Sequence, residues 1–426
     1  MLRAFINAFK IPDLRRKLLF TLGILAVYRV GAWIPIPGVE AELLAEATGA
    51  GAAGNIVGIL NVFTGGALQQ MAVFALGIMP YITASIIMQL LAVVIPKLET
   101  LQREGEQGRR KITQYTRYVT VGLALLQSTA LVTLARNGAA FDGVNVMPDA
   151  GTGIVIVAVL TLTAGTSLIM WLGELITARG IGNGMSLLIY VSIISQFPSE
   201  LALVRISNGW GWVVGVLLMG FLLTIAVVFI EMGQRRIPVQ YARRQVGRRS
   251  YGGQSTYIPL KVNQSGVIPV IFASSLMILP GLVAQISGSQ AVVEWTERYL
   301  ADATSWVYIL VFALLTIFFA YFYSAITFNP VEVADNMKRY GGFVPGIRPG
   351  RQTAEYLDKV LTRLTLPGSL YLATIAVLPF ILLAVGNIQA FPLGGVSLLI
   401  MVGVALQTMQ QIESQLMQRN YEGFLR

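Results

Sequence analysis

The chain has no cysteine and no histidine, and only 12% of its 426 residues are charged. The missing residue types exclude disulfides, thiolate nucleophiles, cysteine or histidine metal sites, and any serine or cysteine nucleophile paired with a histidine base. Soluble proteins carry about 25% charged residues. A chain that is 55% hydrophobic with so few charges could not cover a soluble surface. The composition therefore predicts a polytopic membrane protein without cofactors or metal ions.

Charge-free stretches locate the membrane spans, because a helix needs about 20 apolar residues to cross the hydrocarbon core. Residues 364–412 carry no charge and are long enough for two spans, with a turn that begins near Gly386. Arg29 lies near the outer end of the first span, and we expect its side chain to reach the membrane surface. Single spans are predicted within 18–34, 71–96, 118–135, 150–173, 180–199, 206–230, 262–293 and 303–331.

The residues before the second span are too polar and too rich in glycine to face lipid, although 47–70 carries no charge. Irregular backbone at membrane depth survives only inside protein or beside water. We therefore expect a short helix around 56–63 that dips back into the protein, and glycines such as Gly65 and Gly66 that permit hinging.

The distribution of basic residues predicts the topology. Of the 31 Lys and Arg, one lies in the first span and three lie in the predicted outer loops (Arg136, Arg205 and Arg298), which leaves 27 on the inner side. This bias favours ten spans with both termini inside. Ten spans divide into an N-terminal half (1–200) and a C-terminal half (201–426). Because five is odd, the second half is expected to be inverted, with the functional path between the halves.

The predicted spans after the first have no charge in their interiors. This argues against proton relays and charged selectivity rings. There is no Gly-Lys dipeptide, hence no phosphate-binding loop of the Walker type. The run Gly180–Gly184 follows a span rather than a strand, so we interpret it as a tight loop. An enzyme is not expected, because the chain offers no pair of nucleophile and base.

Two inner loops are long and basic. Residues 231–265 carry three arginine pairs, and residues 327–367 carry six basic residues and the rigid sequence FVPGIRPG. Part of this charge is accounted for by topology. The rest suits docking of a polyanion such as ribosomal RNA, or of an acidic motor surface. The residues expected to dock are Arg243, Arg244, Arg248, Arg249, Arg348 and Arg351.

Six motifs, in order along the whole chain, resemble the SecY family, the central subunit of the bacterial protein-conducting channel. They are FTGGAL (63–68), ALGIMPYITASII (75–87), EGEQGRRKITQYTRY (104–118), RGIGNGMS (179–186), QSTYIPLKVNQSGVIPVIFASS (254–275) and ADNMKRYGGFVPGIRPG (334–350).

The resemblance implies an all-α clamshell of ten spans in two inverted halves, around a central pore that passes unfolded secretory proteins. Membrane-protein segments would leave through a lateral gate between spans two and seven, flanked by spans three and eight. The implied partners are SecE, SecG, the SecA motor ATPase, the ribosome, signal sequences, unfolded preproteins and membrane lipid. The implied location is the bacterial plasma membrane.

The resemblance also assigns residues to the channel parts. Segment 55–68 matches the plug that closes the outer funnel, with Asn61, Phe63, Thr64, Gly65 and Gly66. The polar gate residues would be Gln89, Gln127 and Asn263, for which ordinary hydrogen bonding between helices is an equal alternative. The pore ring maps to Ile78, Ile82, Ile189, Ile271 and Ile400.

An apolar ring suits such a pore, because it dewets when empty and makes weak contacts with any passing chain. Ile78 and Ile82 are four residues apart and share one helix face. Isoleucine is also stiff at its first torsion angle. The alternative from another class is a secondary transporter for a small solute, which would need a charged or ion-binding site at the membrane midplane.

Overall fold

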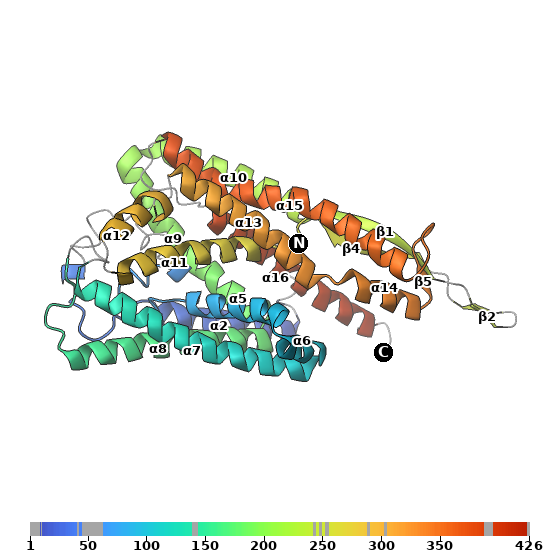
Figure 1. Cartoon of the computed structure of the whole chain (residues 1–426), viewed down its shortest axis with the longest axis horizontal. Helices are drawn as coiled ribbons and strands as arrows, with labels where there is room; N and C mark the ends of the chain where they lie inside the picture. The colour runs from blue at the N-terminus through green and yellow to red at the C-terminus, as the bar shows by residue number, and fades with distance from the viewer. Residues whose placement is uncertain are drawn as a thin grey trace.

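The computed structural model describes residues 9, 11–40, 42–44, 63–138, 144–241, 244–246, 249–251, 255–287, 290–301, 305–386 and 395–423. Among these residues, ten helices of 16 to 36 residues form the body of the molecule and lie along its long axis (Figure 1). They are α2 (Pro12–Gly31), α5 (Met79–Val94), α7 (Glu106–Arg136), α8 (Thr152–Arg179), α9 (Gly184–Asn208), α10 (Trp210–Glu231), α11 (Ile268–Ser287), α13 (Trp306–Thr327), α15 (Arg351–Gly386) and α16 (Gly395–Gly423).

Seven of these described helices are long and apolar enough to cross a membrane, and α5 makes an eighth together with α6 (Pro96–Arg103). The α5–α6 pair bends by 104° at Pro96, which lacks the amide hydrogen that a continuous helix needs. The two remaining long helices are α2, which carries four basic residues, and α11, whose apolar part is shorter. Each predicted span thus coincides with one long helix of the described residues, and the ten-helix architecture is confirmed.

The two halves of the chain meet on two sides of the bundle. On one side α9 packs against α10 and α16, and on the other side α5 packs against α11. Within the halves, α5 packs against α7, and α11 packs against α13. A bundle joined in this way, along α9 and at the α5–α11 contact, is a clamshell.

The run Gly180–Gly184 is the tight loop that its sequence predicts. Gly182 has a φ of +88°, in the region that favours glycine. Asn183 caps α9, because its Oδ1 accepts a hydrogen bond from the Met185 amide at 3.1 Å. The loop therefore turns the chain from α8 into α9.

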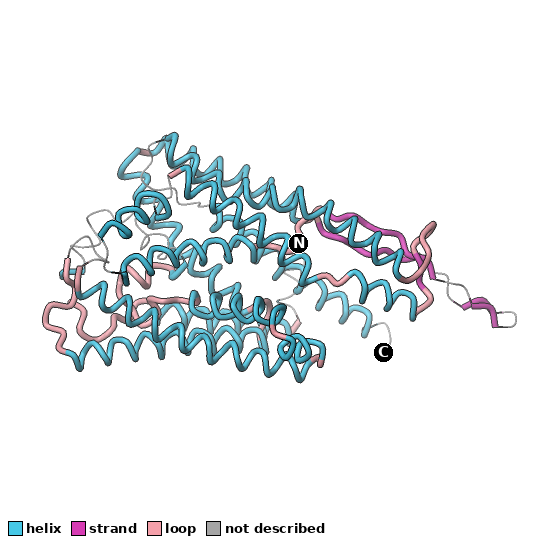
Figure 2. The backbone as a smooth tube through the Cα atoms, viewed as in Figure 1, coloured by secondary structure: helices cyan, strands magenta, loops and turns pink. Residues whose placement is uncertain are grey.

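A small antiparallel sheet lies beside the first turns of α15, at one end of the molecule (Figure 2). Its strand order is β4 (Ser255–Lys261), β1 (Gln234–Tyr241) and β5 (Gly342–Phe343). In register, Ile237 pairs with Ile258, and Gln240 pairs with Phe343. A separate hairpin joins β2 (Arg244–Val246) to β3 (Arg249–Tyr251). Since β1 and β4 come from loop 231–265 and β5 from loop 327–367, one sheet holds the two basic loops together.

The chain is mostly helical, as the fold-class prediction requires, but this small sheet was not predicted. Its cause is visible in β1, where Ile237 and Val239 alternate with exposed residues and are themselves only 2% and 1% exposed. These side chains pack on Leu260 of β4, and on Met337 of α14 (Pro330–Arg339) and Leu357 of α15. The two loops thus build a hydrophobic core of their own, separate from the bundle.

Exposed tryptophans mark the opposite end of the bundle. Near this end lie the short helix α12 (Gln290–Thr296) and the π-helix η1 (Glu297–Ala301) (Figure 1). Tryptophan is enriched where a membrane meets water. Five tryptophans lie at this end, and each is 46% to 72% exposed. Trp33 follows α2, Trp210 and Trp212 lie in the first turn of α10, Trp295 lies in α12, and Trp306 begins α13.

Candidate functional site

The five isoleucines of the predicted ring are all buried, and they come from both halves of the chain. Ile78 caps α5 and Ile82 lies one turn further along that helix. The other three lie on α9, on the first turn of α11 and on α16. All five belong to one apolar cluster, with exposed fractions of 3% (Ile78), 8% (Ile82), 4% (Ile189), 8% (Ile271) and 0% (Ile400).

A cavity of about 240 Å³ joins this cluster to polar groups. Ile189, Ile271 and Ile400 line it together with side chains that can hydrogen-bond. The cavity thus combines an apolar wall from three helices with a polar wall that water can wet. Its polar lining includes Asn183, Ser186, Glu231, Lys261, Asn263, Gln264, Gln407 and Gln410.

The three predicted gate amides have separate roles in the structure. Asn263 precedes α11, where its Nδ2 donates to Glu231 Oε2 at 2.9 Å and to the Gly266 carbonyl at 3.0 Å. Gln89 Nε2 donates to Ser85 Oγ of its own helix at 3.4 Å. Gln127 lies half-buried on α7. In the described part of the chain no hydrogen bond joins any two of the three, so the structure does not bring them together as one polar gate.

The helices assigned to the gate are neighbours nevertheless. α5 packs against α11, and they are flanked by α7 and α13 respectively. The packing between α11 and α13 is aromatic, since the Phe272 ring of α11 meets the Phe319 ring of α13 edge-on, with centroids 5.6 Å apart. The α5–α11 contact is therefore a seam between the two halves.

The predicted plug falls partly outside the described residues, and this includes Asn61. Its described part is core: Phe63 is 3% exposed and Thr64 is 1% exposed. Gly65 and Gly66 follow as a turn, with φ of +67° and +90°. The chain then continues through buried residues to Ile78 and α5.

Arg29 corrects the expectation that its side chain reaches the membrane surface. Its Nη1 donates to the Gly65 carbonyl at 2.9 Å, and the residue is half-buried. A guanidinium at membrane depth needs an acceptor, and the carbonyl of a turn 36 residues away provides one. The sequence does single out Arg29, because it is the one basic residue within the apolar part of a predicted span. The sequence does not show that the Gly65 carbonyl is its partner.

The predicted docking arginines lie on the sheet end of the molecule, where they are described. Arg243 and Arg248 are outside the described residues, while Arg244 begins β2 and Arg249 begins β3. Arg348 is exposed, and its carbonyl accepts from Thr353 Oγ1 at 2.9 Å. The Arg351 side chain is 92% exposed and pairs with Glu355 at 2.9 Å. Because β1 pairs with β5, both basic loops form one surface.

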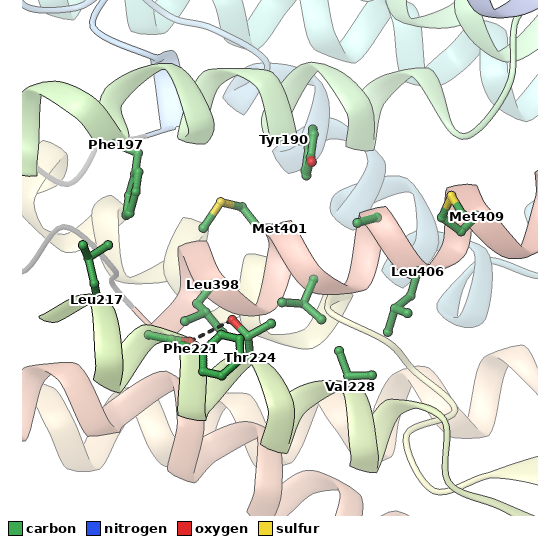
Figure 3. Close-up of a pocket in the computed structure, with 13 residues that line it drawn as sticks. Tyr190, Phe197, Leu217, Phe221, Thr224, Val228, Leu398, Met401, Leu406 and Met409 are labelled. Atoms are coloured by element: carbon green, nitrogen blue, oxygen red, sulfur yellow. Dashed lines mark hydrogen bonds between the residues drawn. The ribbon is translucent and has the colours of Figure 1, made fainter. Parts of the chain in front are cut away.

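Sequence reasoning missed an apolar groove of about 400 Å³ between α9, α10 and α16 (Figure 3). No charged side chain lines it. Its two lining hydroxyls belong to Tyr190 and Thr224, and the Thr224 hydroxyl donates to the Gly220 carbonyl at 2.8 Å. Its surface is therefore suited to an apolar helix or chain. Apolar residues on these spans gave no signal, because lipid-facing residues look the same. The figure shows Tyr190, Phe197, Leu217, Phe221, Met401 and Met409 around the groove.

Known proteins with this architecture are protein translocases. The SecY family model matches residues 72–409. The protein translocase subunits SecY of Streptomyces coelicolor and Mycobacterium tuberculosis are 59% identical over 438 residues and 55% identical over 442 residues, and each alignment covers the whole of both chains. One solved structure, described as a protein conducting channel, is 16% identical with a TM-score of 0.63 and covers 93% of this chain and 91% of its own.

A second structure, Sec61 in the canine ribosome-channel complex, has a TM-score of 0.60 at 16% identity, with 93% and 91% of the two chains covered. The fold is thus that of multi-pass, protein-conducting membrane channels. The chain belongs to the SecY family. It is a protein-conducting channel, and the alternative of a small-solute transporter is not supported.

Proposed function

We propose that this channel carries unfolded secretory proteins across the bacterial plasma membrane and releases membrane-protein segments sideways into the bilayer. The observation that carries the proposal is the buried isoleucine cluster at the wall of a polar cavity between the two halves. An apolar ring dewets when empty and offers interchangeable contacts to any sequence. A polar cavity beside it can keep an arriving chain hydrated.

The test replaces the three cavity-lining isoleucines, Ile189, Ile271 and Ile400, together by serine. In vesicles that contain the purified channel, we expect resting ion conductance to rise while preprotein translocation continues, because polar groups hold water in the ring. The matched control is Ile176→Ser on α8, which is also fully buried but lies outside the cavity. An unchanged conductance in a folded triple variant would place the seal elsewhere. Ile78 and Ile82 complete the proposed ring.

Lateral release is proposed at the seam between α5 and α11. The two helices come from different halves and have their own flanking neighbours, α7 and α13. This arrangement favours opening by separation of the halves rather than by unfolding of a helix. Gln89, Gln127 and Asn263 lie on or before the helices of this gate. Segment 55–68 is proposed as the plug that closes the outer funnel of the channel.

The surface built from the two basic loops is proposed to dock the ribosome and the SecA motor through Arg243, Arg244, Arg248, Arg249, Arg348 and Arg351. Its support is the sheet that joins the loops and the exposure of Arg348 and Arg351. Several charge contacts together give strong salt dependence. We expect Arg348→Glu to impair motor-driven translocation and motor-stimulated ATP hydrolysis without loss of folding. Arg298→Glu, at the opposite end of the molecule, is the control and should leave both unchanged.

The remaining assignments follow from the family and the composition. SecE and SecG are proposed as small membrane partners, and the apolar groove of Figure 3 offers a surface for one apolar helix. Both termini are proposed to be cytoplasmic, and residues 1–200 and 201–426 to act as the two halves. The energy for transport would come from the motor or the ribosome, because we propose no enzymatic activity for the chain.

A further inference from the structure

The Gly65–Gly66 turn leads into the second span and is built into the protein core. Both glycines have the positive φ that favours this residue. The side chains around them are buried, with Phe63 at 3%, Ala67 at 0% and Leu68 at 2% exposure. Their contacts extend into two apolar clusters, one shared with α2 and one shared with α7 and α8. A turn packed in this way is poorly suited to act as a free hinge.

Polar side chains from α2 and α9 surround the turn. Arg29 of α2 donates to the Gly65 carbonyl. A Cβ placed on Gly65 would lie 2.9 Å from Arg29 Nη1 and 2.9 Å from the Cα of Ser192 on α9. A Cβ placed on Gly66 would lie 3.2 Å from the Nε2 of Gln196, also on α9. The two glycines therefore fill a seat that no larger residue could occupy without displacing its walls.

The two walls of this seat are bonded to each other. The hydroxyls of Tyr28 on α2 and Ser192 on α9 share a buried hydrogen bond of 2.6 Å. The Tyr28 ring also stacks on Phe74, with centroids 5.6 Å apart. Gly31 makes room for the Phe74 ring, which a side chain at that position would meet. The hydrogen bond between Tyr28 and Ser192 thus fixes the distance between α2 and α9 at this seat. The Phe74 contacts hold the chain that follows the turn.

The segment after the turn is tied to the chain that follows α2. Pro35 and Ala72 form an isolated antiparallel bridge. Beside it the Ile36 amide donates to the Met71 carbonyl at 2.9 Å, and the Val73 amide donates to the Ile34 carbonyl at 2.8 Å. All these partners belong to the N-terminal half of the chain.

We propose that the Gly65–Gly66 turn, near the end of the proposed plug segment 55–68, is a fixed anchor, which Arg29 seats against α2 and α9. The anchor stays in place while a polypeptide passes through the channel, and it is not the hinge that its glycines led us to expect. The inference rests on the proposed channel function. Arg29 is then a positioning residue, because hydrogen bonds from a charged donor are roughly twice as strong as neutral ones. The anchor matters for the seal because the same segment ends at Ile78 of the proposed ring.

A disulfide across the bridge tests whether the anchor moves. The chain has no cysteine, so P35C and A72C would supply the only two thiols. The flanking hydrogen bonds show that Pro35 and Ala72 form a non-hydrogen-bonded pair. In such a pair the Cα atoms are about 4.5 Å apart, which a disulfide spans without strain. Mass spectrometry would confirm that the bond has formed.

We expect oxidised and reduced forms of this double variant to translocate a preprotein into vesicles at the same rate. A block on oxidation that reductant relieves would overturn the anchor, because it would show that this segment must move. Loss of translocation by the unsubstituted chain would instead count against the proposed function.

Arg29 variants give a second test that needs no disulfide. We expect Arg29→Gln to raise the unseated population, and with it the resting ion conductance, by about tenfold, since this matches the loss of a hydrogen bond to a charged group. Arg29→Lys should be intermediate, because it keeps one charged donor. The control is Arg205→Gln at the end of α9, where the arginine stacks on Trp210 at 4.7 Å. A folded Arg29→Gln channel with unchanged conductance would contradict the proposal.

Discussion

Two turns in this molecule each lead into a helix of the proposed gate, and each is bound by a residue of opposite charge. The turn at Gly65–Gly66 leads to Ile78 and α5, and the turn at 263–266 leads to Ile271 and α11. Each is tied to a charged residue near the end of the first long helix in its half. Arg29 of α2 donates to the backbone of the first turn. Glu231 of α10 accepts from the Asn263 side chain of the second turn.

The two turns differ in their surroundings. The first is enclosed by α2 and α9 and by apolar side chains. The second borders the cavity of about 240 Å³, where Lys261 and Gln264 also lie. A buried turn is held by shape as well as by hydrogen bonds, whereas a turn that borders a cavity with a polar lining can exchange its hydrogen bonds with water that enters the cavity. We call the turn that leads into α5 the α5 entrance, and the turn that leads into α11 the α11 entrance. We conclude that the α5 entrance is rigid and the α11 entrance is adaptable.

Substitution of Gly65 by alanine should give the largest loss of stability, because it strains the backbone and also overpacks the seat. The left-handed φ costs a non-glycine residue roughly 1–2 kcal/mol, and overpacking against the Ser192 backbone adds about 1–3 kcal/mol. We expect Gly65→Ala to lower the free energy of unfolding by the sum of the two, measured by chemical unfolding of the purified channel.

Gly266→Ala is the matched control in the second turn. Gly266 has a φ of +61°, but its Cβ position has no atom within 4 Å. Its alanine variant should show only the backbone cost of roughly 1–2 kcal/mol. Equal losses at the two glycines would remove the distinction between a rigid and an adaptable turn.

Removal of the Asn263 side chain should have a smaller effect. Asn263→Ala leaves the Glu231 carboxylate without its amide donor, which costs about 1–3 kcal/mol when the group is buried. Water in the cavity should keep the loss at the lower end of that range. Glu231→Gln keeps an acceptor for the Asn263 amide and should be milder still. The unfolding midpoints of the two variants test this order.

Gln264→Ala is the control for this pair, since its Oε1 accepts from the Lys261 amide at an exposed position, at 3.2 Å. It should have little effect. A loss for Asn263→Ala as large as that for Gly65→Ala would show that the second turn is as rigid as the first.

The difference between the turns also shows how far the sequence could be interpreted. Charge-free stretches place all ten spans, because crossing hydrocarbon imposes a length and a composition that local residues reveal. The Gly65 partner of Arg29 and the Glu231 partner of Asn263 are not local: they lie 36 and 32 residues away. Hydropathy could only place Arg29 near a surface, and the family resemblance could only place Asn263 near a gate.

The sheet was not predicted from the sequence, for a related reason. The alternation around Ile237 and Val239 is a strand signal, but it lies in a stretch dominated by arginine, and the strand that completes its pairing, β5, comes about a hundred residues later. The ring isoleucines were found through the family resemblance alone, because buried isoleucines are common in a chain of this composition. The groove of Figure 3 had no signal of either kind.

The smallest expected effect concerns the helices that flank the two entrances. Beside α5, α7 is tied to α8 by a two-point ion pair, in which Arg117 Nε and Nη2 donate to the Glu174 carboxylate at 2.8 and 2.7 Å. The side chains are 48% and 23% exposed. Exposed ion pairs typically contribute about 0.2–1 kcal/mol. We expect a double-mutant cycle with Arg117→Gln and Glu174→Gln to give a coupling energy near the top of that range, because the pair is bidentate.

The pair of Arg110 and Glu106 on α7 is the internal reference for this cycle, since both side chains are about four-fifths exposed, at 79% and 81%. Its coupling should be about 0.3–0.5 kcal/mol and should fall with added salt. If the Arg117–Glu174 coupling matched this reference, the flank of α5 would owe its stability to apolar packing alone. It would then resemble the flank of α11, where Phe272 packs on Phe319, and the rigidity of the α5 entrance would depend on the Gly65–Gly66 seat by itself.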